Sequence, residues 1–139
     1  MKFEIDHVAI SVKDLTATIA WYSRLFDFQL VRTFDRPDLR AKGAFLRLGD
    51  VSLEVFEFQN SDAVPDYRKE LSSDLRVHGT KHFALRVTDV NESVEDLKEQ
   101  GVEFVMSPVI GGSGRKYVFF TDPDGILVEL IEATQAKGA

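Results

Sequence analysis

The sequence predicts an α+β fold in which two tandem βαβββ modules form one cupped mixed sheet. The first observation behind this prediction is a long internal repeat. The stretch "DHVAISV" at 6–12 recurs as "KHFALRV" at 81–87, and "SLEVFE" at 52–57 recurs as "LVELIE" at 127–132, both at a step of 75 (82 − 7 = 75). The second observation is that each copy begins with apolar and polar residues in the alternation typical of a strand, followed by apolar residues at helical spacing. A repeat of this length exceeds that of a solenoid unit, so two copies of one half-domain are expected.

The first module, at about residues 3–58, opens with a predicted half-buried strand. Two sets of side chains alternate along it and should point to opposite faces, Val8, Ile10 and Val12 on one and His7, Ala9 and Ser11 on the other. A helix follows, which Thr16 can cap and which ends near Asp27. Its apolar residues recur at helical spacing and can cover the Val8 face.

Three more strands complete the first module. They are predicted at 28–34, 43–48 and 51–58, with a loop between the first two and a turn at Gly49-Asp50 between the last two. The polar stretch at about 59–80 is interpreted as a linker with one helical turn near residues 66–71.

The second module, at about residues 81–133, repeats the βαβββ order. A strand at 81–87 precedes a helix from Asn91 to Gln100, which Gly101 ends. Strands then follow at 103–109, 116–121 and 126–132, and the turn "DPDG" joins the last two. We therefore expect residues 1–139 to form a single domain.

Composition narrows the functional classes. Lys plus Arg number 17 against 23 for Asp plus Glu, which gives a net charge of −6 and disfavours a nucleic-acid partner. The absence of cysteine excludes disulfides and thiolate metal sites. The N-terminal segment lacks a secretory signal pattern, and no apolar run reaches transmembrane length. We expect a cytoplasmic protein with no membrane partner. We also expect a homodimer, because a partner would cover the sheet edges.

Four side chains stand out because they keep the step of 75. His7 corresponds to His82 and Glu54 to Glu129 (129 − 54 = 75), and alternation places each on the face away from its helix. A glutamate within an apolar strand is costly unless it is paired or bound to a metal. If the modules pack about a pseudo-two-fold axis, these residues converge on one divalent ion. A second interpretation is that the histidines hydrogen-bond near strand ends and the glutamates face solvent.

The motifs "HVAISVKDL", "LEVFEF", "KHFALRV" and "FFTDPDGILVELIE" resemble those of the vicinal oxygen chelate superfamily, and within it the bacterial glyoxalase I (lactoylglutathione lyase-like) type. The resemblance implies a metal held by His7, Glu54, His82 and Glu129. Nickel or zinc is preferred, with cobalt, manganese or iron as alternatives. It also implies a lyase or isomerase that acts through an enediolate on a small α-hydroxycarbonyl or hemithioacetal substrate. Glu129 is the favoured base and Glu54 its rival.

Two departures from this family concern substrate anchoring. Glyoxalase I proteins commonly carry an arginine and an asparagine that hold glutathione, where this sequence has Ser11 and Phe58. Arg86, the counterpart of Ser11 (86 − 11 = 75), is a candidate for binding an acidic substrate group. The loop "GGSGR" at 111–115 suggests further anion contacts from Arg115 and Lys116.

Other activities of the same fold remain as alternatives. A ferrous extradiol-type dioxygenase would need two histidines and one carboxylate, which the fourth ligand Glu54 argues against. An acyl-CoA epimerase of the methylmalonyl type usually has glutamine at the Glu54 position. A metal-free drug-binding dimer usually lacks the four ligands altogether.

Overall fold

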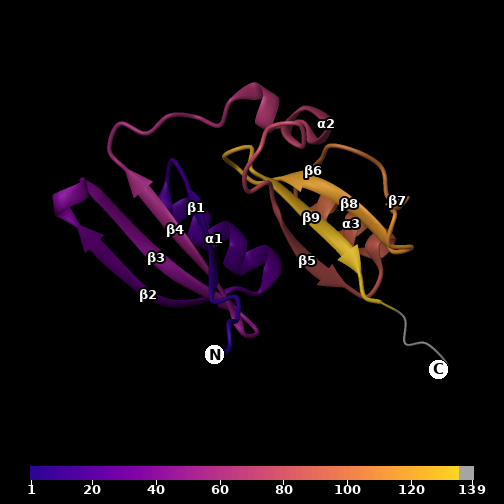
Figure 1. The fold of residues 1–139 in the computed structure, drawn as a ribbon, viewed down its shortest axis with the longest axis horizontal. Coiled ribbons are helices and arrows are strands. Elements are labelled where there is room, and N and C mark those ends of the chain that lie inside the picture. The colour runs from indigo at the N-terminus through magenta and orange to yellow at the C-terminus, as the bar shows by residue number, and fades with distance from the viewer. Residues whose placement is uncertain (135–139) are drawn as a thin grey trace. The chain divides into compact units, whose positions relative to one another are not determined.

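The computed structural model describes residues 1–134 and forms two compact units, the first comprising Met1–Ala63 and the second beginning at Val64 (Figure 1). Each unit combines one mixed β-sheet with a long helix, and so the predicted α+β class is confirmed. The joining of both modules into one cupped sheet stays a prediction. Within residues 1–134, no helix is both long and apolar enough to cross a membrane.

Unit 1 follows the predicted βαβββ order. Its elements are β1 (His7–Ser11), α1 (Leu15–Phe26), β2 (Gln29–Arg36), the 3-10 turn Pro37–Leu39, β3 (Ala41–Leu48) and β4 (Val51–Phe58). The strand order in the sheet is β1-β4-β3-β2, with β1 parallel to β4 and the other neighbours antiparallel. Because β2 and β3 extend toward each other, the loop expected between them is shortened to the 3-10 turn.

Unit 2 repeats this plan with one interruption. Its elements are the 3-10 turn Asp66–Arg68, α2 (Leu71–Asp74), β5 (Phe83–Val87), α3 (Val90–Glu99), β6 (Glu103–Phe104), β7 (Val109–Ile110), β8 (Lys116–Thr121) and β9 (Leu127–Glu132). The sheet order is β5-β9-β8-β6, and β7 also pairs with β8. The single strand predicted at 103–109 is therefore wrong. Pro108, which has no N–H to donate, lies in the break between β6 and β7.

The register of the parallel strands preserves the repeat seen in the sequence. Val8 lies opposite Leu53 in unit 1, and Phe83 lies opposite Val128 in unit 2. The residue numbers of both partners are thus higher by 75 in unit 2. Buried apolar residues alternate along these strands and form the helix-covered face of each sheet. They include Ile10, Leu46, Leu53 and Val55 in unit 1 and Val118, Phe120, Val128 and Leu130 in unit 2. The intervening residues therefore occupy the opposite, open face.

The start of each long helix is fixed by two carboxylates. Asp14 accepts a hydrogen bond from Ala17 N, and Asp89 accepts one from Glu92 N, each at 3.0 Å. The prediction that Thr16 caps the first helix is wrong, because Asp14 is the cap and the helix begins directly after it, at Leu15. A carboxylate is also well placed beside the partial positive charge of a helix N-terminus.

A second carboxylate reaches each helix from the last strand of the unit. Glu57 Oε1 accepts a hydrogen bond from Leu15 N at 2.8 Å, and Glu132 Oε2 accepts one from Val90 N at 2.9 Å. These pairs also differ by 75 (132 − 57 = 75). Each bond satisfies a helix N–H that has no partner within the helix, and so ties the helix to the sheet.

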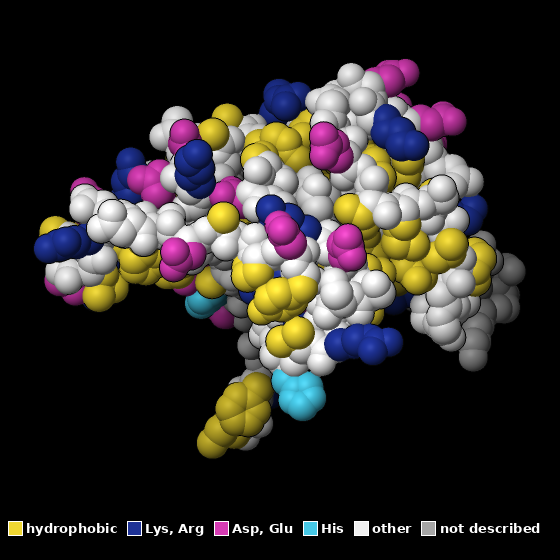
Figure 2. Space-filling model, turned by 90° about the horizontal axis from the view of Figure 1, so that it is seen from above, with side chains coloured by type: hydrophobic (Ala, Val, Ile, Leu, Met, Phe, Trp, Pro, Cys, Tyr) yellow, Lys and Arg dark blue, Asp and Glu magenta, His cyan; other side chains and the backbone are white. Residues whose placement is uncertain are grey.

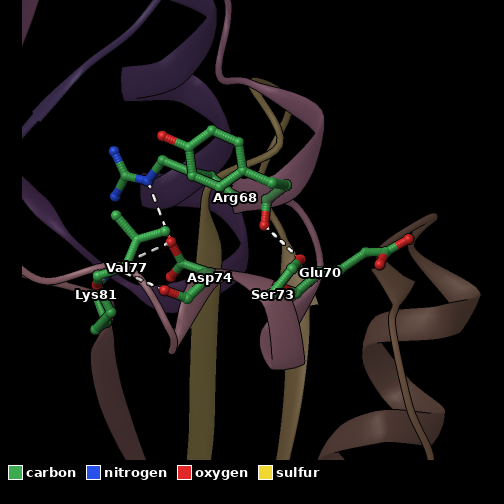
Figure 3. Close-up of polar contacts among 7 residues, drawn as sticks. Arg68, Glu70, Ser73, Asp74, Val77 and Lys81 are labelled. Carbon is green, nitrogen blue, oxygen red and sulfur yellow. Dashed lines mark hydrogen bonds and ion pairs between the residues drawn. The ribbon is translucent and has the colours of Figure 1, made fainter.

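The segment predicted as a linker contains a buried ion cluster (Figure 3). The side chain of Asp74, at the end of α2, is only 1% exposed, and its Oδ1 lies 3.3 Å from Arg68 Nε and 3.4 Å from Lys81 Nζ. Lys81 Nζ also donates to the main-chain oxygens of Asp74 and Val77. Two cations therefore compensate the buried carboxylate and hold residues 68–81 together.

Candidate metal-binding site

His7 and Glu54 form a pair on the open face of unit 1. His7 opens β1, and Glu54 lies two residues farther along the sheet, opposite Ala9. His7 Nε2 is 3.4 Å from Glu54 Oε1, and His7 Nδ1 is 2.7 Å from Asp6 Oδ2. The imidazole thus lies between two carboxylates, one on each ring nitrogen.

This geometry suits a cation beside Nε2 of His7. An ionised carboxylate only accepts hydrogen bonds, and so the contact with Asp6 places a proton on Nδ1. In the neutral ring the lone pair on Nε2 then faces the carboxylate of Glu54. These two electron-pair donors, 3.4 Å apart, require a proton or a metal ion between them. The hydrogen bond to Asp6 raises the pKa of His7, burial opposes this shift, and the charge of Glu54 adds to the increase. A carboxylate on the far nitrogen is also a common support for metal-binding histidines.

His82 and Glu129 form the corresponding pair in unit 2. His82 Nε2 lies 3.1 Å from Glu129 Oε2. The other ring nitrogen, Nδ1, is buried and has no hydrogen-bond partner within residues 1–134. The residue before the histidine explains this difference between the units, because Asp6 corresponds to Lys81 (81 − 6 = 75), whose ammonium group is bound at Asp74 instead.

Each histidine also contacts a phenylalanine that the sequence did not identify. The ring of His7 meets Phe45 edge-on with centroids 5.8 Å apart, and His82 meets Phe119 in the same way at 4.6 Å. Phe45 lies opposite Glu54 in β3, and Phe119 lies opposite Glu129 in β8. The two phenylalanines differ by 74 (119 − 45 = 74), so a search at a constant step of 75 does not match them.

Each unit thus offers two metal donors, one imidazole and one carboxylate. Within residues 1–134, no group of three or more His, Cys, Asp or Glu side chains is arranged to hold a metal ion. Two donors are too few for a stable site, since zinc sites use three or four protein ligands. The imidazole and carboxylate donors of each pair are of the kind that a divalent ion binds, and the convergence of both pairs on one ion stays a prediction.

Sequence comparison supports what the duplicated units suggest. The family model described as "Glyoxalase/Bleomycin resistance protein/Dioxygenase superfamily" matches residues 4–130. The chain belongs to this superfamily. The predicted resemblance to glyoxalase-type proteins is confirmed, and the relatives named as lactoylglutathione lyase and methylmalonyl-CoA epimerase are enzymes.

Glyoxalase relatives resemble this chain over most of its length. It is 33% identical to a lactoylglutathione lyase of Salmonella typhimurium over 133 residues, which cover 94% of this chain and 93% of the relative. Its identity to a lactoylglutathione lyase of Arabidopsis thaliana is 34%, covering 91% of this chain but only 43% of the relative. The chain therefore spans less than half the length of this plant relative. A glyoxalase family protein from Enterococcus faecalis shares the fold, with a TM-score of 0.78, 34% identity and coverage of 93% and 97% of the two chains.

The superfamily also contains enzymes with other substrates. The human mitochondrial methylmalonyl-CoA epimerase is 27% identical to this chain over 133 residues, covering 93% of this chain and 73% of the relative. Membership alone therefore does not select a substrate.

The three candidate anion-binding residues occupy different positions in this superfamily member. Arg86 lies opposite Ile131, two residues beyond Glu129, and so it is on the open face, where it is exposed. Arg115 Nη1 donates to the main-chain oxygen of Glu132 at 3.4 Å. Lys116 alternates with the open-face residue Tyr117 along β8 and therefore lies on the helix-covered face. Arg86 is thus the cation that shares a sheet face with Glu129.

Charged side chains of both signs are mixed over the surface shown in Figure 2, with hydrophobic side chains between them. This view shows no broad surface of positive charge. This face therefore offers no continuous basic area for a polyanion.

Proposed function

We propose that this protein is a divalent-metal-dependent lyase or isomerase of the glyoxalase type. It acts on a small α-hydroxycarbonyl or hemithioacetal substrate through an enediolate. The observation that carries the proposal is the pair of imidazole–carboxylate contacts, His7 with Glu54 and His82 with Glu129. The two contacts occupy equivalent positions, 75 residues apart, in the duplicated units. The similarity to lactoylglutathione lyases supports the same reaction class.

His7, Glu54, His82 and Glu129 would hold one divalent ion. Two neutral imidazoles and two carboxylates balance its charge, and nickel or zinc suits nitrogen and oxygen donors, as do cobalt, manganese and iron. When bound, the ion supplies Lewis-acid stabilisation of negative charge on the substrate oxygens.

A glutamate performs the proton transfer. Glu129 takes a proton from the carbon next to the substrate carbonyl and returns it to the neighbouring carbon, so that no proton is gained or lost. A carboxylate at the site can reach both carbons, and Phe119, opposite Glu129, provides an apolar neighbour that limits the access of water. Glu54 is the rival base, because its surroundings in unit 1 are similar.

Arg86, on the same face as Glu129, would bind an acidic group of the substrate. Arg115 remains a secondary candidate for this role, whereas the position of Lys116 on the helix-covered face argues against it. We further propose a cytoplasmic homodimer, which would have twice the chain mass of 15.7 kDa. Light scattering would test this assembly directly.

A second candidate is epimerisation of an acyl-CoA ester, favoured by the similarity to methylmalonyl-CoA epimerase. It shares the key step, in which a carboxylate removes a proton next to a carbonyl. A ferrous dioxygenase and a metal-free drug-binding dimer are alternatives of the same fold. Glu54, as a fourth donor beside His7, argues against both.

Deuterium exchange tests the proposal. Protein reconstituted with nickel, and protein treated with a chelator, would be incubated in deuterium oxide with a panel of α-hydroxycarbonyl compounds, glutathione hemithioacetals and acyl-CoA esters. We expect deuterium at the carbon next to the carbonyl with the metal-loaded protein alone. Exchange in neither sample across the panel would refute proton-transfer chemistry. Exchange into acyl-CoA esters only would favour the epimerase.

A further inference from the structure

Four phenylalanines lie on the open face of unit 1, beside the His7–Glu54 pair. Phe45 is opposite Glu54 in the sheet, and Phe56 and Phe58 alternate with Glu57 along β4, on the same side as Glu54. Phe34 of β2 is opposite Gly43, which is opposite Phe56. We refer to Phe34, Phe45, Phe56 and Phe58 as the phenylalanine surface.

The four rings contact one another in sequence. Ring centroids are 5.7 Å apart for Phe34 and Phe45, 5.9 Å for Phe34 and Phe56, and 5.8 Å for Phe56 and Phe58. These separations lie in the range of favourable aromatic pairs. The ring of Phe34 lies over Gly43, where an added Cβ would collide with that ring and with the Val55 carbonyl oxygen. The glycine therefore lets the rings form one continuous apolar layer.

A cation borders the phenylalanine surface. The guanidinium carbon of Arg32 lies 5.6 Å from the centroid of the Phe45 ring. Arg32 is exposed, and none of the ion pairs found within residues 1–134 gives it a carboxylate partner. Its charge is thus available to an anion that lies on the aromatic layer.

We infer that the substrate of the proposed site carries an aromatic or other apolar group, which packs on the phenylalanine surface, and a carboxylate, which binds Arg32. The inference rests on the proposed function, because the vicinal oxygens of the substrate would lie at His7 and Glu54. Along a strand, Glu54 and Phe56 are two residues, or about 6.7 Å, apart, which is close to the length of a phenyl group. A phenyl ring attached to the reacting carbon therefore reaches the layer.

The same surface disfavours a peptide-like substrate group such as glutathione. Amide N–H and C=O groups placed against phenylalanine rings lose their hydrogen bonds to water and gain no replacement. Apart from the charged groups of Glu54 and Arg32, the polar side chain that the register places opposite this surface is Ser11, which faces Phe56. A single hydroxyl cannot satisfy several amides, so specificity shifts toward apolar compounds.

Binding of lactate and mandelate to the nickel-loaded full chain tests the inference by calorimetry. Both compounds present the same hydroxyl and carboxylate oxygens, and they differ in a methyl against a phenyl group. We expect mandelate to bind at least about tenfold more tightly than lactate, because its phenyl group adds one aromatic contact and buries additional apolar area. Equal affinity for the two compounds would overturn the inference.

Variants locate the preference on the phenylalanine surface. Phe56→Ala and the milder Phe34→Leu should bring the mandelate-to-lactate ratio close to one, and Phe104→Leu, in unit 2, should leave it unchanged. The ratio of the two affinities does not depend on the fraction of folded protein, so partial unfolding of a variant would not by itself bring the ratio to one. An unchanged ratio in both surface variants would overturn the assignment.

Mandelate with an additional ring carboxylate tests the role of Arg32. It should bind more tightly than mandelate to the wild type, and Arg32→Gln should abolish that gain. The same gain in the variant would refute the anion contact.

Two further measurements separate this inference from other outcomes. Metal content is determined on every sample, so loss of metal binding would refute the proposed function, whereas bound metal without phenyl preference would refute the inference alone. Light scattering is run on both surface variants. If they dissociate a dimer and the wild type shows no phenyl preference, the surface is an interface between two copies of the chain.

Discussion

His82 Nε2 lies 3.1 Å from Glu129 Oε2, while Nδ1 of the same ring is buried without a hydrogen-bond partner in the described chain. In unit 1 the equivalent ring nitrogen is bound to Asp6. Protein groups thus satisfy the His7 ring more fully than the His82 ring.

Replacement of His82 should remove most of the bound metal. His82→Ala eliminates one of four proposed donors, and three ligands that include two flexible glutamates hold an ion less firmly. Elemental analysis after reconstitution and dialysis would measure the loss. The matched control is His78→Ala, which changes the one remaining histidine of the chain, an exposed residue outside the strands. Equal metal in the wild type and the His82 variant would show that the four-residue site is wrong.

The two glutamates should differ in their effect on proton transfer. Glu129→Gln keeps an oxygen donor but cannot accept the proton, so we expect it to retain metal and to lose deuterium exchange by about 10²–10⁴-fold. Glu54→Gln should keep part of the exchange. Exchange rates measured by NMR on metal-loaded samples would compare the two. The opposite pattern would assign the base to Glu54.

The buried carboxylate of Asp74 should contribute strongly to stability. Asp74→Ala leaves the largely buried ammonium group of Lys81 without its carboxylate and should lower the free energy of unfolding by roughly 3 kcal/mol. Asp66→Asn is the control, since it removes the exposed ion pair with Lys69 in the same segment and should change stability by less than about 0.5 kcal/mol. Urea unfolding would measure both. Equal effects would refute the cluster's role.

The N-terminal helix caps of the two units should contribute equally to the stability of the protein. Asp14→Ala and Asp89→Ala each remove a side-chain acceptor from a helix N-terminus and should each cost about 1 kcal/mol. Asp96→Ala changes an exposed aspartate within α3, where alanine favours the helix, so no loss is expected. Thermal unfolding would compare the three variants. A loss in the Asp96 variant as large as in the cap variants would argue against capping.

Much of the fold could be predicted because the duplication is visible in the sequence. A constant step of 75 assigns His7 and His82, or Glu54 and Glu129, to equivalent positions, and strand alternation assigns them to one face. The structure shows each histidine beside its glutamate within a unit. The convergence of all four residues on one ion stays a prediction.

Other features depend on contacts that a repeat does not reveal. Phe45 and Phe119 do not keep the step of 75. The chain between Phe119 and its partner Glu129 is one residue longer than the chain between Phe45 and its partner Glu54. Asp74 lies in a polar stretch whose composition resembles a linker, and nothing in that composition indicates that its carboxylate is buried and paired with Arg68 and Lys81. Turn and linker segments lack the periodicity on which such predictions rely.

The two halves of the chain differ from each other unevenly along the repeat. Positions that build each half, such as the caps Asp14 and Asp89, are unchanged between the copies. Positions on the open face have separated, since Phe56 corresponds to Ile131 (131 − 56 = 75) and Ser11 to Arg86. An ancestral pair of identical halves would have presented the same surface twice to a ligand with two different ends. Changes at such open-face positions would let each half contact a different end of a ligand, while substitutions in the scaffold, such as Phe83 in place of Val8, keep its apolar character.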